Sequence, residues 1–297
     1  MKKMLPLLMA VLTMILLLGF AAPASADTLE VGNAIEFGDN LTAANSGDII
    51  QLTADITYTD PISITAGMTI TFDVNGHTLT VQNDSAIVLT VNGGVLILED
   101  STGGGEFNVI SDDIYSAVNI LNGGTATVTN AISDTASVVN VTGGTLTLLG
   151  NVTGNGYGVY AAGSSIVTID GVINADPYIA FSDSINSKGD YTKPFDDSLG
   201  YLEYTDGTSY VYLRAVCQIL DTSDDVSETY NDLDDALDDV NDDETIKLLA
   251  DINYNSGIFI LDKSFTFDVN GFILNVRCSN DDVTESGAAL EVSDGKV

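Results

Sequence analysis

Two adjacent carboxylates, Asp112 and Asp113, are the residues of this chain whose types and spacing could most directly do chemistry. Paired carboxylates serve as general acid and base in glycosidic bond cleavage. Cleaving an acidic polysaccharide also requires a cation to hold the substrate carboxylate. Between Met4 and Ser187 the chain contains no Lys or Arg. Because 34 of its residues are Asp, a solvated loop is the simpler interpretation of this pair.

A second candidate site is a group of tyrosines between positions 191 and 212. Tyrosine has a flat apolar face and a polar edge, which suits stacking on sugar rings. The members are Tyr191, Tyr201, Tyr204, Tyr210 and Tyr212. Strand alternation places Tyr210 and Tyr212 on one face and Tyr201 and Tyr204 on opposite faces. Tyr201, Tyr204, Tyr210 and Tyr212 are therefore the candidate glycan contacts. The alternative is packing of their hairpin against the rest of the fold, and the absence of Trp weakens a carbohydrate site.

Acidic runs could supply oxygen ligands to a structural calcium ion. The candidates are Asp224-Asp225, Asp242-Asp243-Glu244 and Asp281-Asp282. None has the EF-hand pattern, because the run from Asp239 to Ala250 has Glu244 where that loop needs Gly and Ala250 where it needs Glu. A water-facing acidic surface is the simpler explanation and the one that we prefer. No cofactor is required by any pattern in the chain.

The chain contains a partial copy of itself. Leu52-Thr53-Ala54-Asp55-Ile56 returns as 248–252, and Phe72-Asp73-Val74-Asn75-Gly76 returns as 267–271. The copy ends at Leu290–Gly295, which we interpret as a second module that is incomplete. A duplicated unit favours an elongated, modular protein. The only histidine, His77, corresponds to Phe272 in the copy, so we interpret it as a packing or turn residue instead of a catalytic one.

Four segments in the first copy share a β-branched stretch, a small-residue turn and an alternating apolar stretch. Their turns are Gly93-Gly94, Gly123-Gly124, Gly143-Gly144 and Gly163-Ser164, spaced 30, 20 and 20 residues apart. Strands repeating at this period without helices between them predict a parallel β-helix, in which each coil buries the apolar face of the next. The longer spacing leaves room for a loop at 99–105. A β-sandwich with hairpin turns is the alternative.

These features predict the following organisation. A signal peptide at 1–26 is followed by a capping helix within 27–48, a first parallel β-helix at 49–183, and a linker and β-hairpin at 184–215. Residues 216–297 form the start of a second, incomplete β-helix module, with its own capping helix at about 230–241. The apolar stripe Phe37, Leu41 and Ala44, repeated as Leu233, Leu237 and Val240, indicates both helices. Such helices would cover the exposed ends of the sheets.

The second copy resembles the right-handed, pectin-lyase-like β-helix modules of secreted bacterial and archaeal surface proteins that are called adhesin-like. The resemblance lies in Tyr230–Leu233, Glu244–Ile252 and Phe267–Gly271, and in the strands around Asp206-Gly207. It implies an all-β, right-handed parallel β-helix solenoid with a capping helix. It also implies a non-enzymatic extracellular or cell-surface repeat protein whose partners are glycans or proteins of another cell surface.

Enzymes of the same fold provide the alternative function. Its lyases commonly use an Arg base with calcium, and its hydrolases place several Asp on adjacent coils. Asp112 and Asp113 resemble one element of the hydrolase site, but no Gly-His-Gly or Arg-Ile-Lys occurs in the chain. A secreted polysaccharide lyase or hydrolase is thus the second hypothesis. An architectural envelope component without a ligand is the third.

Charge and the N-terminal segment indicate where the protein acts. Lys2, Lys3, the apolar stretch after them and Ala24-Ser25-Ala26 predict an export signal, so we expect a secreted or cell-surface protein with no membrane insertion after cleavage. Cleavage would change the net charge from −34 to −36, which excludes nucleic acid as a partner. An exported compartment permits a Cys217–Cys278 disulfide, but the two positions are not equivalent in the repeat, so a bridge and free thiols both stay open.

Overall fold

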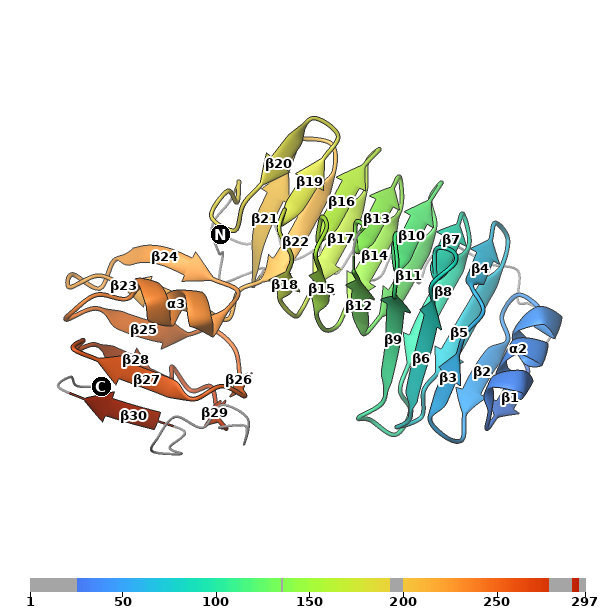
Figure 1. Ribbon diagram of the computed structural model, residues 1–297, viewed down its shortest axis with the longest axis horizontal. Coiled ribbons are helices and arrows are strands. Elements are labelled where there is room, and N and C mark those ends of the chain that lie inside the picture. Colours follow the sequence, from blue (N-terminus) through green and yellow to red (C-terminus); the bar gives the residue numbers. More distant parts are fainter. Residues whose placement is uncertain (1–25, 135, 193–199, 278–289, 294–297) are drawn as a thin grey trace, which may run out of the picture.

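A computed structural model describes residues 26–134, 136–192, 200–277 and 290–293. Three long sheets form the first part of the molecule, and we name them A, B and C (Figure 1). Sheet A contains, in spatial order, β1 (Thr28–Val31), β2 (Ile49–Leu52), β5 (Thr69–Asp73), β8 (Val95–Glu99), β11 (Thr125–Val128), β14 (Thr145–Leu148), β17 (Ile166–Ile169), β22 (Tyr210–Arg214) and β21 (Tyr201–Thr205). Sheet B contains β3 (Ile56–Tyr58), β6 (Thr78–Asn83), β9 (Glu106–Ser111), β12 (Asn130–Ser133), β15 (Val152–Gly154) and β18 (Ile173–Asn174). Sheet C contains β4 (Ile62–Thr65), β7 (Leu89–Asn92), β10 (Val118–Leu121), β13 (Val139–Thr142), β16 (Val159–Ala162), β19 (Ile179–Phe181) and β20 (Ser184–Asn186).

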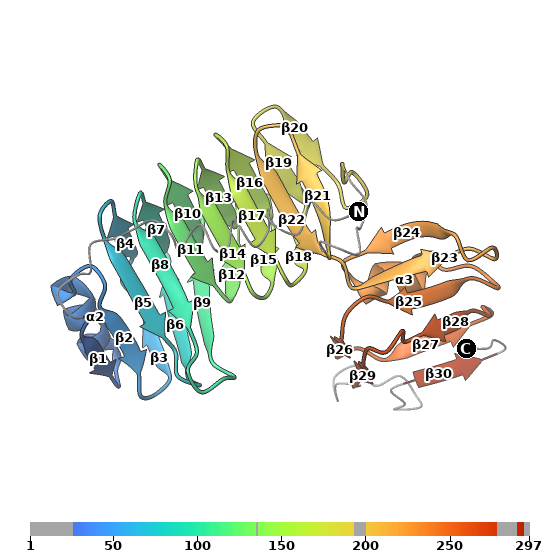
Figure 2. The same cartoon turned by 180° about the vertical axis from the view of Figure 1, so that it is seen from behind.

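The chain passes through sheets A, B and C in turn, which makes it a parallel β-solenoid. From β2 to β19 it completes six such coils, and neighbouring coils pair in parallel in all three sheets (Figure 2). Val95 pairs with Thr125, Thr125 with Thr145, and Thr145 with Ile166, so these coils span 30, 20 and 21 residues. The parallel β-helix prediction is confirmed at the level of a solenoid, and the β-sandwich alternative is wrong because it would require antiparallel hairpins.

The corners between sheets C and A explain the paired glycines. The first glycine of each pair has a positive φ, such as 79° at Gly123 and 70° at Gly143. The second lies against the backbone of the preceding coil, and a Cβ on Gly124 would be 2.4 Å from the carbonyl oxygen of Val91. A side chain there would separate the coils, so the spacing of these glycines reports the coil period.

The core consists of columns of apolar side chains that point inward from successive coils. One column in sheet C runs through Ile62, Leu89, Val118, Val139, Val159 and Ile179. All six are at most 1 % exposed. Parallel pairing brings each residue directly over its partner, so one strand's alternation is repeated through the whole stack.

Helix α2 (Ala34–Ala43) lies over the first coil and completes this core. Asn33 begins the helix, since its side-chain oxygen accepts from the backbone N–H groups of Ile35 and Glu36. Phe37 is fully buried, and its ring meets that of Phe72 edge-on with centroids 5.3 Å apart. Phe72 meets Phe107 in the same way at 5.5 Å. Three aromatic rings therefore connect the helix to coils in sheets A and B. The region 27–48, interpreted from the sequence as a capping helix alone, also contains strand β1.

The repeated Phe-Asp-Val-Asn-Gly motif is a turn that each copy builds in the same way. Asn75 and Asn270 both have a φ of 48°. The side chain of Asn75 donates to the carbonyl of Leu52 at 3.0 Å, and that of Asn270 donates to Leu248 at 3.1 Å. These bonds join the turn to the coil before it. The motif is therefore structural, because its polar atoms are used within the fold.

A second, shorter stack follows the first. It contains a four-stranded sheet and two strand pairs, with helix α3 (Leu233–Asp239) beside them. The four-stranded sheet has the order β24 (Val226–Tyr230), β23 (Cys217–Leu220), β25 (Thr245–Leu248) and β28 (Thr266–Asp268). The pairs are β26 (Ile252–Tyr254) with β29 (Leu274–Val276), and β27 (Ile258–Leu261) with β30 (Leu290–Ser293). Figure 1 shows the two stacks arranged as an arch.

The two stacks begin differently. In the first, β1 pairs in parallel with β2, whereas in the second, β23 pairs antiparallel with β25. Only Ala215 and Val216 separate β22 from β23, so the chain enters the second stack directly from the terminal hairpin of the first. It must then reverse through the β23–β24 hairpin before it reaches α3.

Replacing Phe72 with Ala should lower the free energy of unfolding by about 3–5 kcal/mol, because the cavity would lie between two other buried rings. Phe272, which is 37 % exposed, is the control, and its replacement by Ala should cost less than about 1 kcal/mol. Urea unfolding followed by circular dichroism measures both. Equal losses in the two variants would contradict the packing described.

The Phe-Asp-Val-Asn-Gly turn of the first copy also predicts that the stability of the fold depends on pH. The Asp73 carboxylate is buried, which raises its pKa, but hydrogen bonds from Gln51 at 2.6 Å and from the N–H groups of Ser101 and Asn75 at 3.0 Å outweigh this and leave the pKa lowered. A lowered pKa in the folded state stabilises the fold above the unfolded pKa, near 3.9, and this stabilisation is lost as the pH falls through the folded value.

Asp73→Asn should therefore lower the melting temperature at pH 7, and the difference from the unmodified protein should shrink below about pH 4. Asp268→Asn changes the equivalent residue of the second copy, where the carboxylate accepts from the N–H of Asn270 at 2.9 Å. It serves as the matched control and should shift less. A difference for Asp73→Asn that stays constant from pH 7 to pH 2.5 would show that ionisation of this carboxyl contributes nothing.

Candidate functional site

Asp112 and Asp113 lie exposed in the loop between β9 and β10, at the corner between sheets B and C. The residues that precede this corner, Asn83, Ser111 and Ser133, are in register on consecutive coils. The ladder continues past them, since the N–H of Asp112 bonds to the carbonyl of Asn83 and that of Asp134 to Ser111, each at 3.4 Å. Asp84, Asp112 and Asp134 therefore follow one another along the corner as exposed carboxylates.

The row formed by Asp84, Asp112 and Asp134 has no basic residue near it in the sequence. In the part of the chain that the structure describes, the Lys and Arg residues all come after Ser187. Sequence reasoning missed Asp84 and Asp134. Their signal was a small polar residue followed by Asp at the end of the three consecutive strands β6, β9 and β12, at uneven spacings of 28 and 22 residues. The row could supply an acid or a base to a bound sugar chain.

His77 occupies the turn after Asn75-Gly76, where its N–H donates to the carbonyl of Val74 at 2.8 Å. Phe272 repeats this bond to Val269 at 2.7 Å in the second copy. The imidazole Nδ1 lies 3.6 Å from a carboxylate oxygen of Asp55 and is half-exposed. Its backbone role is thus the same as that of a phenylalanine.

The hairpin predicted around Asp206-Gly207 is present as β21 and β22, which pair antiparallel. Tyr204 points into the core and is fully buried, whereas Tyr201 is half-buried and donates to Asp170 at 2.6 Å. Tyr210 and Tyr212 are half-buried, with ring centroids 6.1 Å apart and planes within 7° of each other. The structure therefore divides the predicted group: one tyrosine serves packing, and a stacked pair lies on the solvent side of sheet A.

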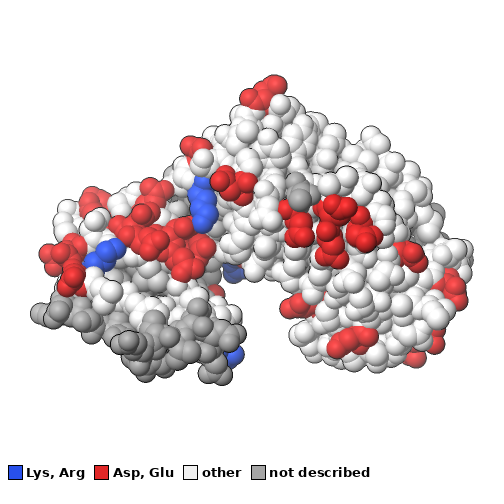
Figure 3. Space-filling view, in the orientation of Figure 1, with Lys and Arg blue, Asp and Glu red and all other residues white. Residues whose placement is uncertain are grey.

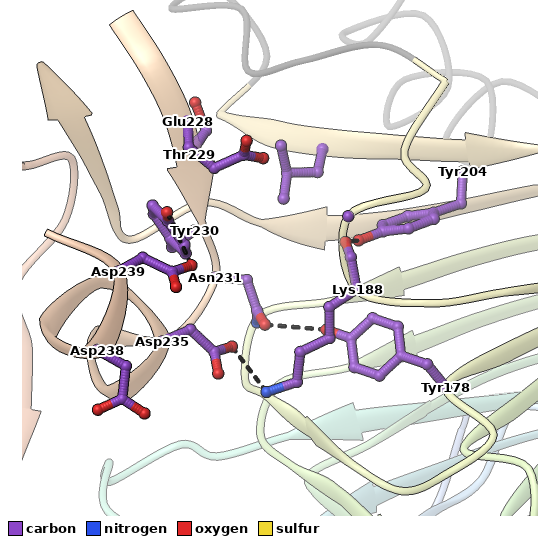
Figure 4. Close-up of a pocket in the computed structure, with 12 residues that line it drawn as sticks. Tyr178, Lys188, Tyr204, Glu228, Thr229, Tyr230, Asn231, Asp235, Asp238 and Asp239 are labelled. Carbon is purple, nitrogen blue, oxygen red and sulfur yellow. Dashed lines mark hydrogen bonds and ion pairs between the residues drawn. The ribbon is translucent and has the colours of Figure 1, made fainter. Parts of the chain in front are cut away.

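A joint between the two stacks brings together residues that are far apart in the sequence (Figure 4). The phenol of Tyr178 donates to the side-chain oxygen of Asn231, whose nitrogen donates to the carbonyl of Gly171, both at 3.0 Å. The ammonium of Lys188 is 2.7 Å from a carboxylate oxygen of Asp235 on α3. The phenol of Tyr191 donates to Glu228 at 2.5 Å. Four polar contacts thus hold the second stack against the end of the first.

A pocket of about 440 Å³ opens at this joint. Among the described residues, its walls include Tyr178, Tyr204 and Tyr230, and its charged lining consists of Glu228, Asp235, Asp238 and Asp239 with Lys188 as the one cation. Figure 3 shows the acidic side chains gathered over this part of the molecule. The volume suits a small ligand, and the excess of carboxylates favours a cationic one.

The tyrosines around the joint are held as neutral hydrogen-bond donors. Burial raises the pKa of Tyr191 to about 12, and the hydrogen bond to Glu228 adds to the effect. Burial also raises the pKa of Tyr178, Tyr204 and Tyr230, with further contributions from neighbouring tyrosines or acids. Burial likewise raises the pKa of the Cys217 thiol, which is therefore protonated and unreactive at neutral pH. Cys278, the other half of the suggested disulfide, lies outside the described residues.

Two of the three acidic runs considered as calcium ligands lie in turns of the second stack. Asp224 and Asp225 lie in the turn between β23 and β24, and Asp242–Glu244 lie between α3 and β25. Asp242 and Glu244 accept backbone N–H groups at 2.8 Å, from Ser264 and Asn241. In the described part of the chain, no three His, Cys, Asp or Glu side chains are grouped so that they could hold a metal ion. Asp281-Asp282 lies outside it.

Comparisons with known proteins were made at three levels. No protein-family model, curated protein or solved structure matches the chain. Neither helix in the described residues has the length and apolar content needed to cross a lipid bilayer. Most of the predicted signal peptide, residues 1–25, lies outside the described part.

The joint yields a prediction about coupling between the stacks. Asn231→Ala removes a buried side chain that bonds to both Tyr178 and Gly171, and it should destabilise the joint by about 1–3 kcal/mol. Tyr178→Phe removes one of these bonds and should cost about 1 kcal/mol. Differential scanning calorimetry should show the melting of the second stack moving to lower temperature, further for Asn231→Ala. A single unchanged transition in both variants would contradict the coupling.

Proposed function

We propose that the protein is a non-enzymatic extracellular or cell-surface repeat protein, adhesin-like in character, that contacts glycans. In this proposal its two stacks are right-handed, pectin-lyase-like β-helix modules, and α2 and α3 cap them. The predicted export signal, the duplication and the stacked coils support it. Stacked coils make a stiff support, and repeated modules add length and multivalent contact.

The surface of the solenoid supports a role in contact with neutral molecules. On the outer face of sheet A, Tyr212 is in register with Thr168, which pairs in turn with Thr147 and Thr127. The face thus presents a row of hydroxyl groups that ends in a phenol. The acids of the first stack lie mainly at its turns, as at Asp84, Asp112 and Asp134. With a net charge of −34, the protein repels acidic polysaccharides, so a neutral glycan is the ligand that this surface favours.

The observation that carries the proposal is the stacked pair Tyr210 and Tyr212 on that outer face. A pair of parallel rings at the end of a hydroxyl row can stack on sugar rings while threonines bond to their hydroxyl groups. Both tyrosines lie on one strand held between β17 and β21. The binding surface would therefore be formed before the ligand arrives.

Affinity electrophoresis in gels containing neutral or acidic soluble polysaccharides tests the proposal. At least one neutral polysaccharide should retard the protein, and Tyr210→Ala with Tyr212→Ala should weaken the binding about thirtyfold, since each aromatic contact contributes about 1 kcal/mol. Tyr160→Ala, on the outer face of sheet C, is the matched control and should bind normally. Retardation that is the same in the double variant, or found only with acidic polysaccharides, would contradict the proposed surface.

The row of Asp84, Asp112 and Asp134 favours a second candidate, a secreted polysaccharide hydrolase or lyase. Carboxylates on adjacent coils could act on a sugar chain that runs along the corner. Reducing-end release from the same panel, with Ca²⁺ present, tests it. Activity that falls at least tenfold in Asp112→Asn and Asp113→Asn but persists in Asp39→Asn would replace the binding proposal with the enzymatic one.

A further inference from the structure

The outer face of sheet A carries two parallel rows of uncharged side chains. The first row consists of Thr125, Thr145, Ile166 and Tyr210 on β11, β14, β17 and β22. The second row, at the other outward position of the same strands, consists of Thr127, Thr147, Thr168 and Tyr212. All of these side chains are half-buried. The stacked tyrosines are therefore the last members of an array that extends over three further strands.

The threonine hydroxyls of this array are free of protein partners. In the described part of the chain, none of the five threonine side chains makes a hydrogen bond. Their oxygen atoms also reach the solvent, because none is among the buried polar atoms that lack a partner. Elsewhere such groups bond within the fold, as Thr53 does to the carbonyl of Val31 at 3.1 Å and Asn130 to Asn108. The hydroxyls of sheet A are therefore available to a ligand.

The spacing of the strands suits a linear polymer that crosses them. Neighbouring strands of a sheet lie about 4.8 Å apart, so each row presents one side chain at about this interval. A sugar residue in an extended, equatorially linked glycan advances along its chain by a similar distance. Successive sugars of such a chain would therefore contact successive strands. A glycan that winds into a helix, as α-1,4-linked glucans do, would leave the face after one or two sugars.

The neighbouring strands set the length of the array. On β8, Val95 pairs with Thr125, and Ile97 is the next outward residue, so the hydroxyl groups stop there. At the other end β22 pairs antiparallel with β21, and the parallel repeat stops. Four strands therefore contribute, and the three steps between them, of about 4.8 Å each, make a site about 14 Å long. This length corresponds to four sugars.

We propose that the outer face of sheet A binds a neutral, unbranched glycan in an extended conformation, aligned with the direction in which the coils stack. Four consecutive sugars lie on Tyr212, Thr168, Thr147 and Thr127, with the first row beside them. The proposal rests on the function proposed above, because it names the class of glycan that the stacked tyrosines contact. The strength of binding should therefore increase with the number of sugars up to four.

Isothermal titration of the protein with oligosaccharides of two to six residues tests the proposal. The extended probes are β-1,4-linked oligomers of glucose, mannose and N-acetylglucosamine, and maltohexaose, an α-1,4-linked glucan, is the coiled probe. In at least one extended series the affinity should rise about tenfold from two residues to four, because the added sugars form further hydrogen bonds, and should level off from four to six. Maltohexaose should bind about tenfold more weakly than the hexamer of that series.

Variants locate the glycan on the threonine rows. Thr127→Val with Thr147→Val keeps the β-branched shape but removes two hydroxyl groups, so it should weaken tetrasaccharide binding about tenfold and leave disaccharide binding unchanged. Thr90→Val, on the outer face of sheet C, is the matched control and should change neither. Thermal melts of each variant confirm that it is folded.

The outcomes separate the extended site from the function on which it rests. A disaccharide that binds as tightly as the tetrasaccharide, yet is lost in Tyr210→Ala with Tyr212→Ala, would overturn the extended site and leave the glycan contact in place. Equal binding of maltohexaose, or equal losses in the sheet A and sheet C threonine variants, would also overturn it. Absence of binding in every series would do the same, and retardation by a neutral polysaccharide would then still support the proposed function.

Discussion

The in-register parallel ladder between coils is the interaction on which the rest of this structure depends. It places each residue directly over its counterpart in the next coil, so that a single side-chain choice is repeated as a column. Inward columns such as Leu89, Val118 and Val139 become the core. Outward columns such as Thr127, Thr147 and Thr168 become a surface array. Because the ladder fixes both at once, the fold and the candidate binding surface arise from the same register.

The same ladder explains why the turns contain residues that few other types could replace, such as the paired glycines. At the corners between sheets C and A the coils approach so closely that the second glycine of each pair has no space for a Cβ. Within sheet B polar side chains also bond across coils, as when the side chain of Asn130 in β12 donates to that of Asn108 in β9 at 2.7 Å. Acids next to the turns can accept backbone N–H groups, as Asp73 does. The other acids of the turns face water.

Much of the fold could be predicted from the sequence because it repeats. The glycine pairs reported the coil period, and the copied Asn75 and Asn270 turns reported the duplication. The start of each stack could not be predicted in this way, since β1 and the β23–β24 hairpin have unlike sequences and pair in opposite senses. The contacts at the joint between the two stacks could not be predicted from the sequence either. Tyr178 and Asn231 are 53 residues apart, and no periodic pattern relates them. The row of acids was found only in part, because loops of different length hide its register in the sequence.

Native-state hydrogen exchange of the backbone amides tests the ladder most directly. If in-register pairing holds the coils together, amides in the central strands β7, β10 and β13 should exchange slowly and with one common free energy of opening, whereas those of Asp113 and Ile114 in the exposed loop between β9 and β10 should exchange fast. Central-strand amides that exchange as fast as the loop, or that fall into unrelated groups from coil to coil, would contradict the account.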